Sequence, residues 1–172
     1  MPILMRTALF VPGNRPDRIE KAFNTEADVV IIDLEDAVPI SQKEISRSNV
    51  REKVAQFSDR VMLVRINALG SPFVDGDLEE AIVEGVNGIV LPKVEKADDV
   101  HDINKLLLEV EKKRSLPEGS ILLFPFLPIG RVSRGVVIWK GALASLRAIP
   151  TEICVSLRAI VSTPGPRVVG RG

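Results

Sequence analysis

Five short apolar runs alternate with segments of helical periodicity, and this alternation constrains the fold more than any other feature of the sequence. The strands that these runs predict lie at residues 6–11, 29–38, 61–67, 88–95 and 120–127. No hairpin turn signal joins one run to the next, so each strand should return through a helix and pair parallel to its predecessor, with right-handed crossovers. The pattern predicts an α/β fold with a parallel sheet. It does not choose between an open doubly wound sheet and a TIM barrel.

Helices are expected between the runs, at residues 17–23, 41–57, 77–85 and 97–114. Ser41 followed by Glu44 has the spacing of a capping box, which would place Ile45 on the buried stripe of the second helix. Asp77 is expected to cap the third helix.

The second apolar run ends in three carboxylates, Asp33, Glu35 and Asp36. This pattern is typical of a buried strand that delivers polar side chains to the rim of a sheet. Because a strand alternates faces with period two, Asp33 and Glu35 should share one side and Asp36 should point to the other. In both α/β architectures this rim carries the ligand site.

Two cations are expected at the same edge of the sheet. Arg65 interrupts the third apolar run near its end, and Lys93 follows the fourth. A buried arginine needs an anion as its partner. Glu35 and Asp36 therefore have two interpretations, as functional groups of a site or as a strand-end ion pair with Arg65 or Lys93. The residues alone leave both open.

The loop at residues 12–18 carries Arg15 and Arg18 close to the start of the first expected helix. Arginines at a helix N-terminus can form an anion site. The spacing alone favours the alternative, that both are ordinary solvated arginines.

Charge is divided unevenly along the chain, although the formal net charge is +0. Residues 1–129 carry 16 lysines and arginines against 22 acidic residues, whereas residues 130–172 carry 7 against 1. We therefore expect two parts, with 130–172 as a basic tail of different character. Basic tails bind phosphates without specificity, but the rest of the chain is acidic, so no nucleic-acid partner is expected.

Composition narrows the class of protein further. A hydrophobic fraction of 45% with 27% charged residues is typical of a globular protein. No apolar run approaches about 18 residues and no signal-peptide pattern is present, so we expect no membrane partner and a cytoplasmic location. Cys154, the single cysteine, excludes an internal disulfide and a cysteine-based zinc cluster.

Four motifs in order resemble the citrate lyase β-subunit family, which is similar to the malyl-CoA, citramalyl-CoA and HpcH/HpaI-type lyases. They are RTALFVPGNRPDR at 6–18, IIDLEDAV at 31–38, VRINALGS at 64–71 and GIVLPKVE at 88–95. The resemblance covers residues 6 to about 127. It implies a TIM (β/α)8 barrel, usually trimeric, that cleaves or forms a carbon–carbon bond next to a thioester or keto acid with Mg²⁺. Residues 1–129 would form the N-terminal part of this barrel.

The resemblance also implies roles for individual residues. Arg65 matches the arginine that binds the substrate carboxylate or enolate oxygen, as a planar guanidinium can. Glu35 and Asp36 match a pair expected to hold metal-bound water or Arg65. Arg15 and Arg18 lie in the loop that resembles a CoA-phosphate contact. Lys93 belongs to a motif that supports the barrel rim.

The match breaks after the fifth apolar run. The family's metal-binding glutamate is replaced by Pro128 or Arg131, depending on alignment, and no aspartate follows Asp102. No metal ligand can therefore be assigned, and the 172 residues correspond to an incomplete barrel of about five β-α units, since a whole one takes about 250 residues. A catalytically inactive barrel fragment or interaction scaffold is thus the alternative to a lyase.

The tail at residues 130–172 has two interpretations. Codon degeneracy permits it to be translated out of frame, because parts of it can be shifted readings of family-like sequence. The other interpretation is a divergent C-terminal segment. The nucleotide sequence would distinguish them.

Overall fold

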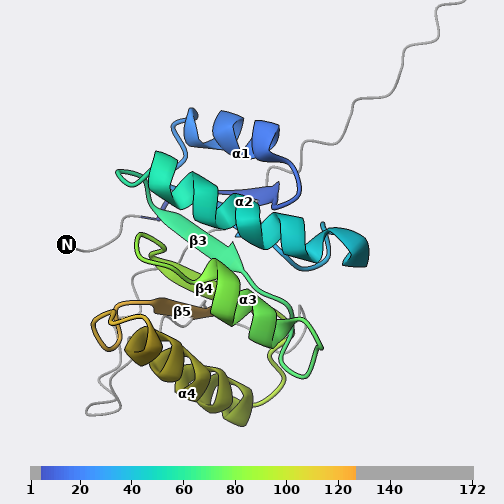
Figure 1. The fold of residues 1–172 in the computed structure, drawn as a ribbon, viewed down its shortest axis with the longest axis vertical. Coiled ribbons are helices and arrows are strands. Elements are labelled where there is room, and N and C mark those ends of the chain that lie inside the picture. The colour runs from blue at the N-terminus through green and yellow to red at the C-terminus, as the bar shows by residue number, and fades with distance from the viewer. Residues whose placement is uncertain (1–4, 127–172) are drawn as a thin grey trace, which may run out of the picture.

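A five-stranded parallel sheet lies at the centre of the protein, in a computed structural model that describes residues 5–126 (Figure 1). Strands and helices alternate along the chain, and the parallel pairing expected from the sequence is confirmed. The elements in order are β1 (Ala8–Pro12), α1 (Pro16–Phe23), β2 (Val29–Asp33), the 3-10 turn η1 (Ile40–Gln42), α2 (Lys43–Gln56), β3 (Met62–Arg65), α3 (Val74–Ala81), β4 (Gly88–Leu91), α4 (Ala97–Lys113) and β5 (Leu122–Pro125).

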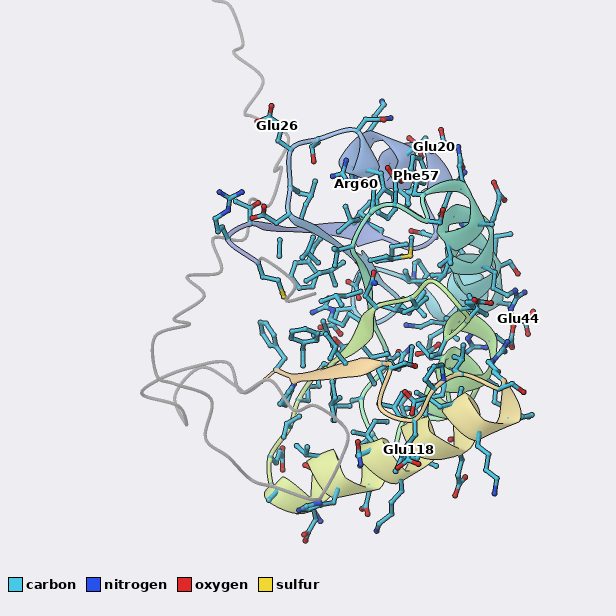
Figure 2. The ribbon with its side chains drawn as sticks, turned by 90° about the vertical axis from the view of Figure 1, so that its left-hand side faces the viewer. Glu20, Glu26, Glu44, Phe57, Arg60 and Glu118 are labelled. Carbon is cyan, nitrogen blue, oxygen red and sulfur yellow. The ribbon has the colours of Figure 1, made fainter. Side chains whose placement is uncertain are left out.

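The arrangement of the layers is that of a barrel wall. The strands lie in the sheet in chain order, β1-β2-β3-β4-β5, and α1 to α4 all pack on one face of it (Figures 1 and 2). Doubly wound sheets carry helices on both faces, whereas a TIM barrel carries them only outside. The described residues therefore form five strands and four helices of barrel type. A fifth helix of the expected series would lie outside the described residues.

Strand side chains alternate between two apolar clusters, as the pleat requires. The cluster between sheet and helices is the larger, and its strand members include Val30, Ile32, Val64, Ile89 and Leu123. The opposite face carries a smaller cluster of Val29, Ile31, Leu63, Val90 and Phe124. Every strand is therefore apolar on both faces, which explains the continuous apolar runs in the sequence.

The start of α2 differs from the expectation. The helix begins at Lys43 with Gln42 as N-cap, and no side chain caps it, so the predicted Ser41–Glu44 capping box is wrong. Ile45 is 55% exposed and lies off the buried stripe. The start of the helix is instead fixed by a buried polar contact of Lys43, described below.

The start of α3 also differs. The helix begins at Val74 with Phe73 as N-cap, and Asp77 is a fully buried residue inside it rather than its cap. The carboxylate of Asp77 binds partners outside α3 instead of the helix's own N–H groups.

Asp28 ties the chain ahead of β1 to the start of β2. Its carboxylate accepts hydrogen bonds from the backbone N–H groups of Arg6 and Thr7, at 2.9 and 3.0 Å, and from the Arg6 side chain at 2.8 Å. These contacts hold the pKa of Asp28 well below its usual range, and the side-chain hydrogen bond from Arg6 is the largest cause.

Among residues 5–126, no helix combines the length and apolar character needed to cross a bilayer. The expectations for the basic tail at 130–172 fall outside the described residues.

Candidate functional site

Asp33 and Arg65 form a bidentate ion pair at the carboxyl ends of β2 and β3, where they are paired in register. Arg65 Nε donates to Asp33 Oδ1 at 2.8 Å, and Nη2 donates to Oδ2 at 2.5 Å. The carboxylate, which is buried, also accepts the backbone N–H groups of Glu35 at 2.8 Å and Ala37 at 3.2 Å. These four bonds fill the acceptor positions of Asp33 and fix the guanidinium in one orientation.

Glu35 is buried between two cations. Its Oε2 lies 3.5 Å from Arg65 Nη1, and its Oε1 lies 2.8 Å from Lys93 Nζ. Asp36 is exposed, and its carboxylate lies 3.4 Å from the same Lys93 nitrogen. Because β2 ends at Asp33, both acidic residues lie in the following turn, where strand alternation no longer decides their direction. The strand-end ion pairs that the sequence left open for Glu35 and Asp36 are present, with Arg65 and Lys93 for Glu35 and with Lys93 for Asp36, while Asp33 is the bidentate partner of Arg65.

Lys93 has a left-handed backbone, with φ of 53°. A residue other than glycine pays about 1 kcal/mol or more for this conformation, so its surroundings must hold it there. The carboxylate of Glu35, and then that of Asp36, raises the pKa of the Lys93 ammonium. The structure thus places Lys93 in contact with the acidic residues that follow β2.

Arg65 keeps donors available for a ligand. Burial opposes its charge, but the hydrogen bond and the charge of Asp33 outweigh burial and raise the pKa of the guanidinium. Nη1 donates no hydrogen bond to any residue in the range 5–126, and the group lies 5.3 Å from the centre of the Phe10 ring. A fixed guanidinium with unused N–H groups can bind a carboxylate or an enolate oxygen.

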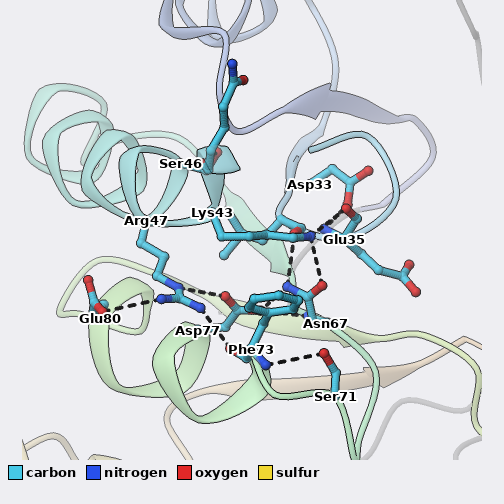
Figure 3. A network of polar contacts seen from close by, with 12 residues as sticks. Asp33, Glu35, Lys43, Ser46, Arg47, Asn67, Ser71, Phe73, Asp77 and Glu80 are labelled. Carbon is cyan, nitrogen blue, oxygen red and sulfur yellow. Dashed lines mark hydrogen bonds and ion pairs between the residues drawn. The ribbon is translucent and has the colours of Figure 1, made fainter. Parts of the chain in front are cut away.

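A buried polar network supports the turn after β2 (Figure 3). Lys43 Nζ donates to the main-chain oxygens of Leu34 and Glu35, at 2.5 and 2.8 Å, and to Asn67 Oδ1 at 2.9 Å. It also lies 5.6 Å from the centre of the Phe73 ring. Burial lowers the pKa of this lysine.

The network continues from Asn67 into the helices. Asn67 donates from its backbone N and from Nδ2 to Asp77 Oδ2, at 2.8 and 2.6 Å, and Asp77 Oδ1 accepts Arg47 Nε at 2.9 Å. Arg47 also donates to the main-chain oxygen of Phe73 at 3.0 Å. The segment after β3 is thereby joined to both α2 and α3.

Analysis of the sequence did not identify Lys43, Arg47, Asn67 or Asp77 as a network. A signal was present, since Lys43 and Arg47 precede Val50 and Val54 at i, i+4, i+7 and i+11, one face of a helix. This face is the buried one. Because several residues on this buried face are polar, a search for apolar periodicity does not identify it.

Arg15 and Arg18 are exposed. Arg15 donates to Asp17 at 3.0 Å from both Nε and Nη2, and this hydrogen bond raises the pKa of Arg15. Within the described chain, no hydrogen bond or ion pair joins either arginine to the carboxylates of Asp33, Glu35 or Asp36. The structure therefore does not bring the two together with the carboxylate cluster by direct contact.

The described residues do not fit the Mg²⁺ ion that the sequence resemblance implies. Across residues 5–126, no group of three or more His, Cys, Asp or Glu side chains is placed to hold a metal ion. The acceptors of Asp33 are filled, and both Glu35 and Asp36 lie against cations. Mg²⁺ needs carboxylate oxygens that bind it directly or through water, and these carboxylates are already committed.

Curated proteins similar to this chain are carbon–carbon lyases by name. The citrate lyase subunit beta of Leuconostoc mesenteroides subsp. cremoris is 37% identical over 119 residues, which make up 68% of this chain and 39% of that protein. The L-malyl-CoA/beta-methylmalyl-CoA lyase of Rhodobacter capsulatus is 36% identical over 113 residues, 63% of this chain and 36% of that protein. The chain thus spans about two fifths of the length of the curated relatives it matches.

Solved structures agree on the fold. A malate synthase of Haloferax volcanii, in a lead(II) complex, has a TM-score of 0.61 at 23% identity over 72% of this chain and 41% of that chain. The protein CitE of Mycobacterium tuberculosis, in complex with magnesium and acetoacetate, has a TM-score of 0.50 at 36% identity over 60% of this chain and 43% of that chain.

A family model covers most of the described fold as well as the site. The model of the HpcH/HpaI aldolase/citrate lyase family matches residues 6–137, a range that includes all five strands and every residue of the carboxylate and cation cluster. Since this match extends over more than half of the sequence, the chain belongs to the HpcH/HpaI aldolase/citrate lyase family.

Proposed function

We propose that this chain takes part in cleaving or forming a carbon–carbon bond next to a thioester, as a citryl-CoA, malyl-CoA or citramalyl-CoA lyase-like protein. Family membership and the names of the curated relatives support the reaction class. The substrates would be small acyl-CoA thioesters or keto and hydroxy acids. Breaking such a bond leaves an enolate, whose charge must be met by fixed positive groups or a cation.

The position of Arg65 carries this proposal. Asp33 holds its Nε and Nη2, while Nη1 lies 3.5 Å from Glu35 Oε2 without a hydrogen bond, so Nη1 can still donate to an anion at the edge of the sheet where barrel enzymes bind substrate. We assign Arg65 the role of binding a substrate carboxylate or the enolate oxygen. Glu35 would keep the guanidinium and Lys93 in place, with the exposed Asp36 as the outer partner of Lys93.

The remaining assignments rest on the family alone. Mg²⁺ is present in the solved CitE complex, and we propose it as the cofactor of the reaction on the strength of the family, with no direct ligand assigned in this chain. Arg15 and Arg18 would meet the phosphates of CoA. A homo-oligomer, a trimer by resemblance, and a cytoplasmic location complete the proposal.

The test is an assay of the full chain with malyl-, citramalyl- and citryl-CoA in the presence of Mg²⁺, together with oxaloacetate binding by calorimetry. Arg65→Met should lower turnover at least 100-fold, the scale expected for losing a fixed donor to a developing oxyanion. Arg65→Lys should not restore it, because lysine lacks the planar fork. Arg51→Met is the matched control, since Arg51 is a half-exposed arginine that pairs with Glu80 on the helical side.

A catalytically inactive member that serves as an interaction scaffold is the second candidate. The observation that favours it is the commitment of the described carboxylates to cations. Oxaloacetate binding that depends on Arg65, without turnover of any thioester, would support an anion-binding scaffold. Absence of both binding and turnover would overturn the proposed lyase.

A further inference from the structure

Lys43 is buried in a way that differs from the other buried lysine of the same helix. Both side chains are almost fully buried, Lys43 at 6% residue exposure and Lys53 at 2%. Lys53 Nζ donates to side-chain oxygens of Glu20, Glu52 and Gln56, at 2.6, 3.0 and 2.9 Å. Two carboxylates thus balance its charge, as expected for a buried cation.

Lys43 makes all its hydrogen bonds to neutral oxygens. Its three partners are the carbonyls of Leu34 and Glu35 and the amide oxygen of Asn67. Among the described residues it forms no ion pair within 4.0 Å, although Asp77, Asp33 and Glu35 act on it from further away. Burying the ammonium group costs desolvation free energy, and no ion pair with a described residue compensates for it. The effect of its hydrogen bonds is to fix the positions of two consecutive carbonyls.

Those carbonyls belong to the turn that carries Glu35. The N–H of Leu34 donates to the carbonyl of Arg65 at 2.8 Å, and the N–H of Glu35 donates to Asp33. Besides the hydrogen bond from Lys43, the carbonyl of Leu34 accepts one from Asn67 Nδ2 at 3.0 Å. All four backbone N–H and C=O groups of residues 34–35 are therefore hydrogen-bonded, which fixes the backbone from which the Glu35 side chain extends toward Arg65.

We propose that Lys43 is a positioning residue of the site: its ammonium group fixes the Leu34 and Glu35 carbonyls and so holds the Glu35 carboxylate between Arg65 and Lys93. It touches neither the cations nor a substrate, and it acts through the main chain. The functional part of this inference rests on the proposed anion-binding role of Arg65. The structural part does not, because it concerns only the turn after β2.

The test compares Lys43→Met and Lys53→Met in the full chain. Both variants remove a buried ammonium from α2 and keep an unbranched apolar side chain, so both should lower stability. Amide hydrogen exchange, measured by NMR, should accelerate at Glu35 and Ala37 at least 10-fold in Lys43→Met beyond any change in global stability. In Lys53→Met the same two amides should follow global stability only.

Binding gives the second readout. Lys43→Met should raise the Kd for oxaloacetate about 10-fold, whereas Lys53→Met should change it less than about twofold. Lys43→Arg, which retains charge and N–H donors, should recover part of the lost affinity.

The outcomes separate the two proposals. If the unmodified chain neither binds oxaloacetate nor turns over a thioester, the proposed function fails, and exchange at Glu35 and Ala37 alone decides whether Lys43 fixes the turn. Exchange that is the same in Lys43→Met and Lys53→Met overturns the positioning role. Faster exchange with unchanged oxaloacetate affinity also overturns it, because the turn would then not control the site.

Discussion

The carboxylate of Asp33 is occupied by four hydrogen bonds within the protein, so it holds other residues in place rather than binding a ligand. Two of its hydrogen bonds hold Arg65 and two hold the backbone of the turn that follows β2. A metal ion or a substrate proton would have to displace one of these bonds. Asp33 therefore determines where Arg65 points, while Arg65 remains the group that can meet an anion.

Replacing Asp33 with Asn should lower the free energy of unfolding by about 3 kcal/mol, the scale for breaking a buried ion pair. The amide NH2 would face an N–H group of Arg65, and the partly buried guanidinium would lose its main counter-charge. Urea denaturation at neutral pH measures the effect. Asp36→Asn is the control, and at this exposed position it should change stability by no more than about 0.5 kcal/mol. Equal losses in the two variants would contradict the assigned difference between the carboxylates.

Sequence reasoning identified Arg65 because a cation inside an apolar run is conspicuous, and it placed the acidic residues beside it for the same reason. The ion pairs of Glu35 with Arg65 and Lys93 are found, but the sequence did not indicate that Asp33 is the bidentate partner of Arg65. Asp33 is the last residue of β2 and lies opposite Arg65 in the register. Register is set by pairing between distant segments, which a local pattern does not reveal.

At the scale of the elements, α2 is attached to the rest of the protein largely by polar groups. Its buried residues include Lys43, Ser46, Arg47, Asn49 and Lys53, beside only two valines. Asn49 Nδ2 donates to the carbonyl of Gly13 at 2.8 Å, which fixes the loop after β1. The loop after β1 also packs tightly on the end of β2, since a Cβ on Gly13 would lie 2.9 Å from the Leu34 side chain and 3.0 Å from the Asp33 carbonyl. One helix thus organises the loops that follow β1 and β2.

The ion pair between α2 and α3 provides a test of this attachment. Asp77→Asn should destabilise the protein by about 3 kcal/mol or more, because it leaves the buried Arg47 without its counter-charge and directs an N–H group at a donor. Glu80→Gln should cost less than about 1 kcal/mol, since Glu80 is half-exposed and 3.4 Å from Arg47. Chemical denaturation of both variants gives the comparison. A larger loss in Glu80→Gln would show that the helices are joined at the surface instead.

Strands were easier to predict than this helix. Apolar runs buried on both faces mark all five strands within a few residues of their observed bounds. The helix predicted at residues 97–114 also matches α4 (Ala97–Lys113), at whose start Asp99 accepts the backbone N–H groups of Glu95 and Lys96. The bounds predicted for α2, residues 41–57, lie close to the observed Lys43–Gln56. Its cap and part of its buried face could not be predicted, because the residues that fix them are polar and find their partners only after the sheet has formed.

At the scale of the whole molecule, several carboxylates have pKa values held below their usual range. The causes are Arg6 for Asp28, Arg15 for Asp17, Lys113 for Glu79 and the backbone N–H of Glu95 for Asp99. A lowered pKa in the folded state means that the unfolded chain binds more protons as the pH falls. This stabilisation is present above the unfolded values, near 3.8 for Asp and 4.5 for Glu, and is lost as the pH falls through the folded values.

Stability should therefore decline on acidification from about pH 5. Asp28→Asn removes the largest of these shifts, so its urea midpoint should lie below that of the unmodified chain at pH 7, and the gap should begin to narrow only below about pH 4. Midpoints measured at pH 7, 5, 4 and 3 test this. Two curves that stay parallel over the whole range would contradict the assignment to Asp28.

The strands lie in the sheet in the order in which they are synthesised, which affects how the protein folds. Each strand from β2 to β5 pairs with the strand made just before it, and α2, α3 and α4 each pack on the preceding helix. Each pairing must still close a β-α-β loop, from Ala8 to Val29 at the first strand pair and from Gly88 to Leu122 at the last, and parallel pairing across such loops is slow compared with the local contacts of a helix bundle. A β-α unit can dock as soon as it leaves the ribosome, since its partner is already in place. The order of synthesis and the order of assembly coincide.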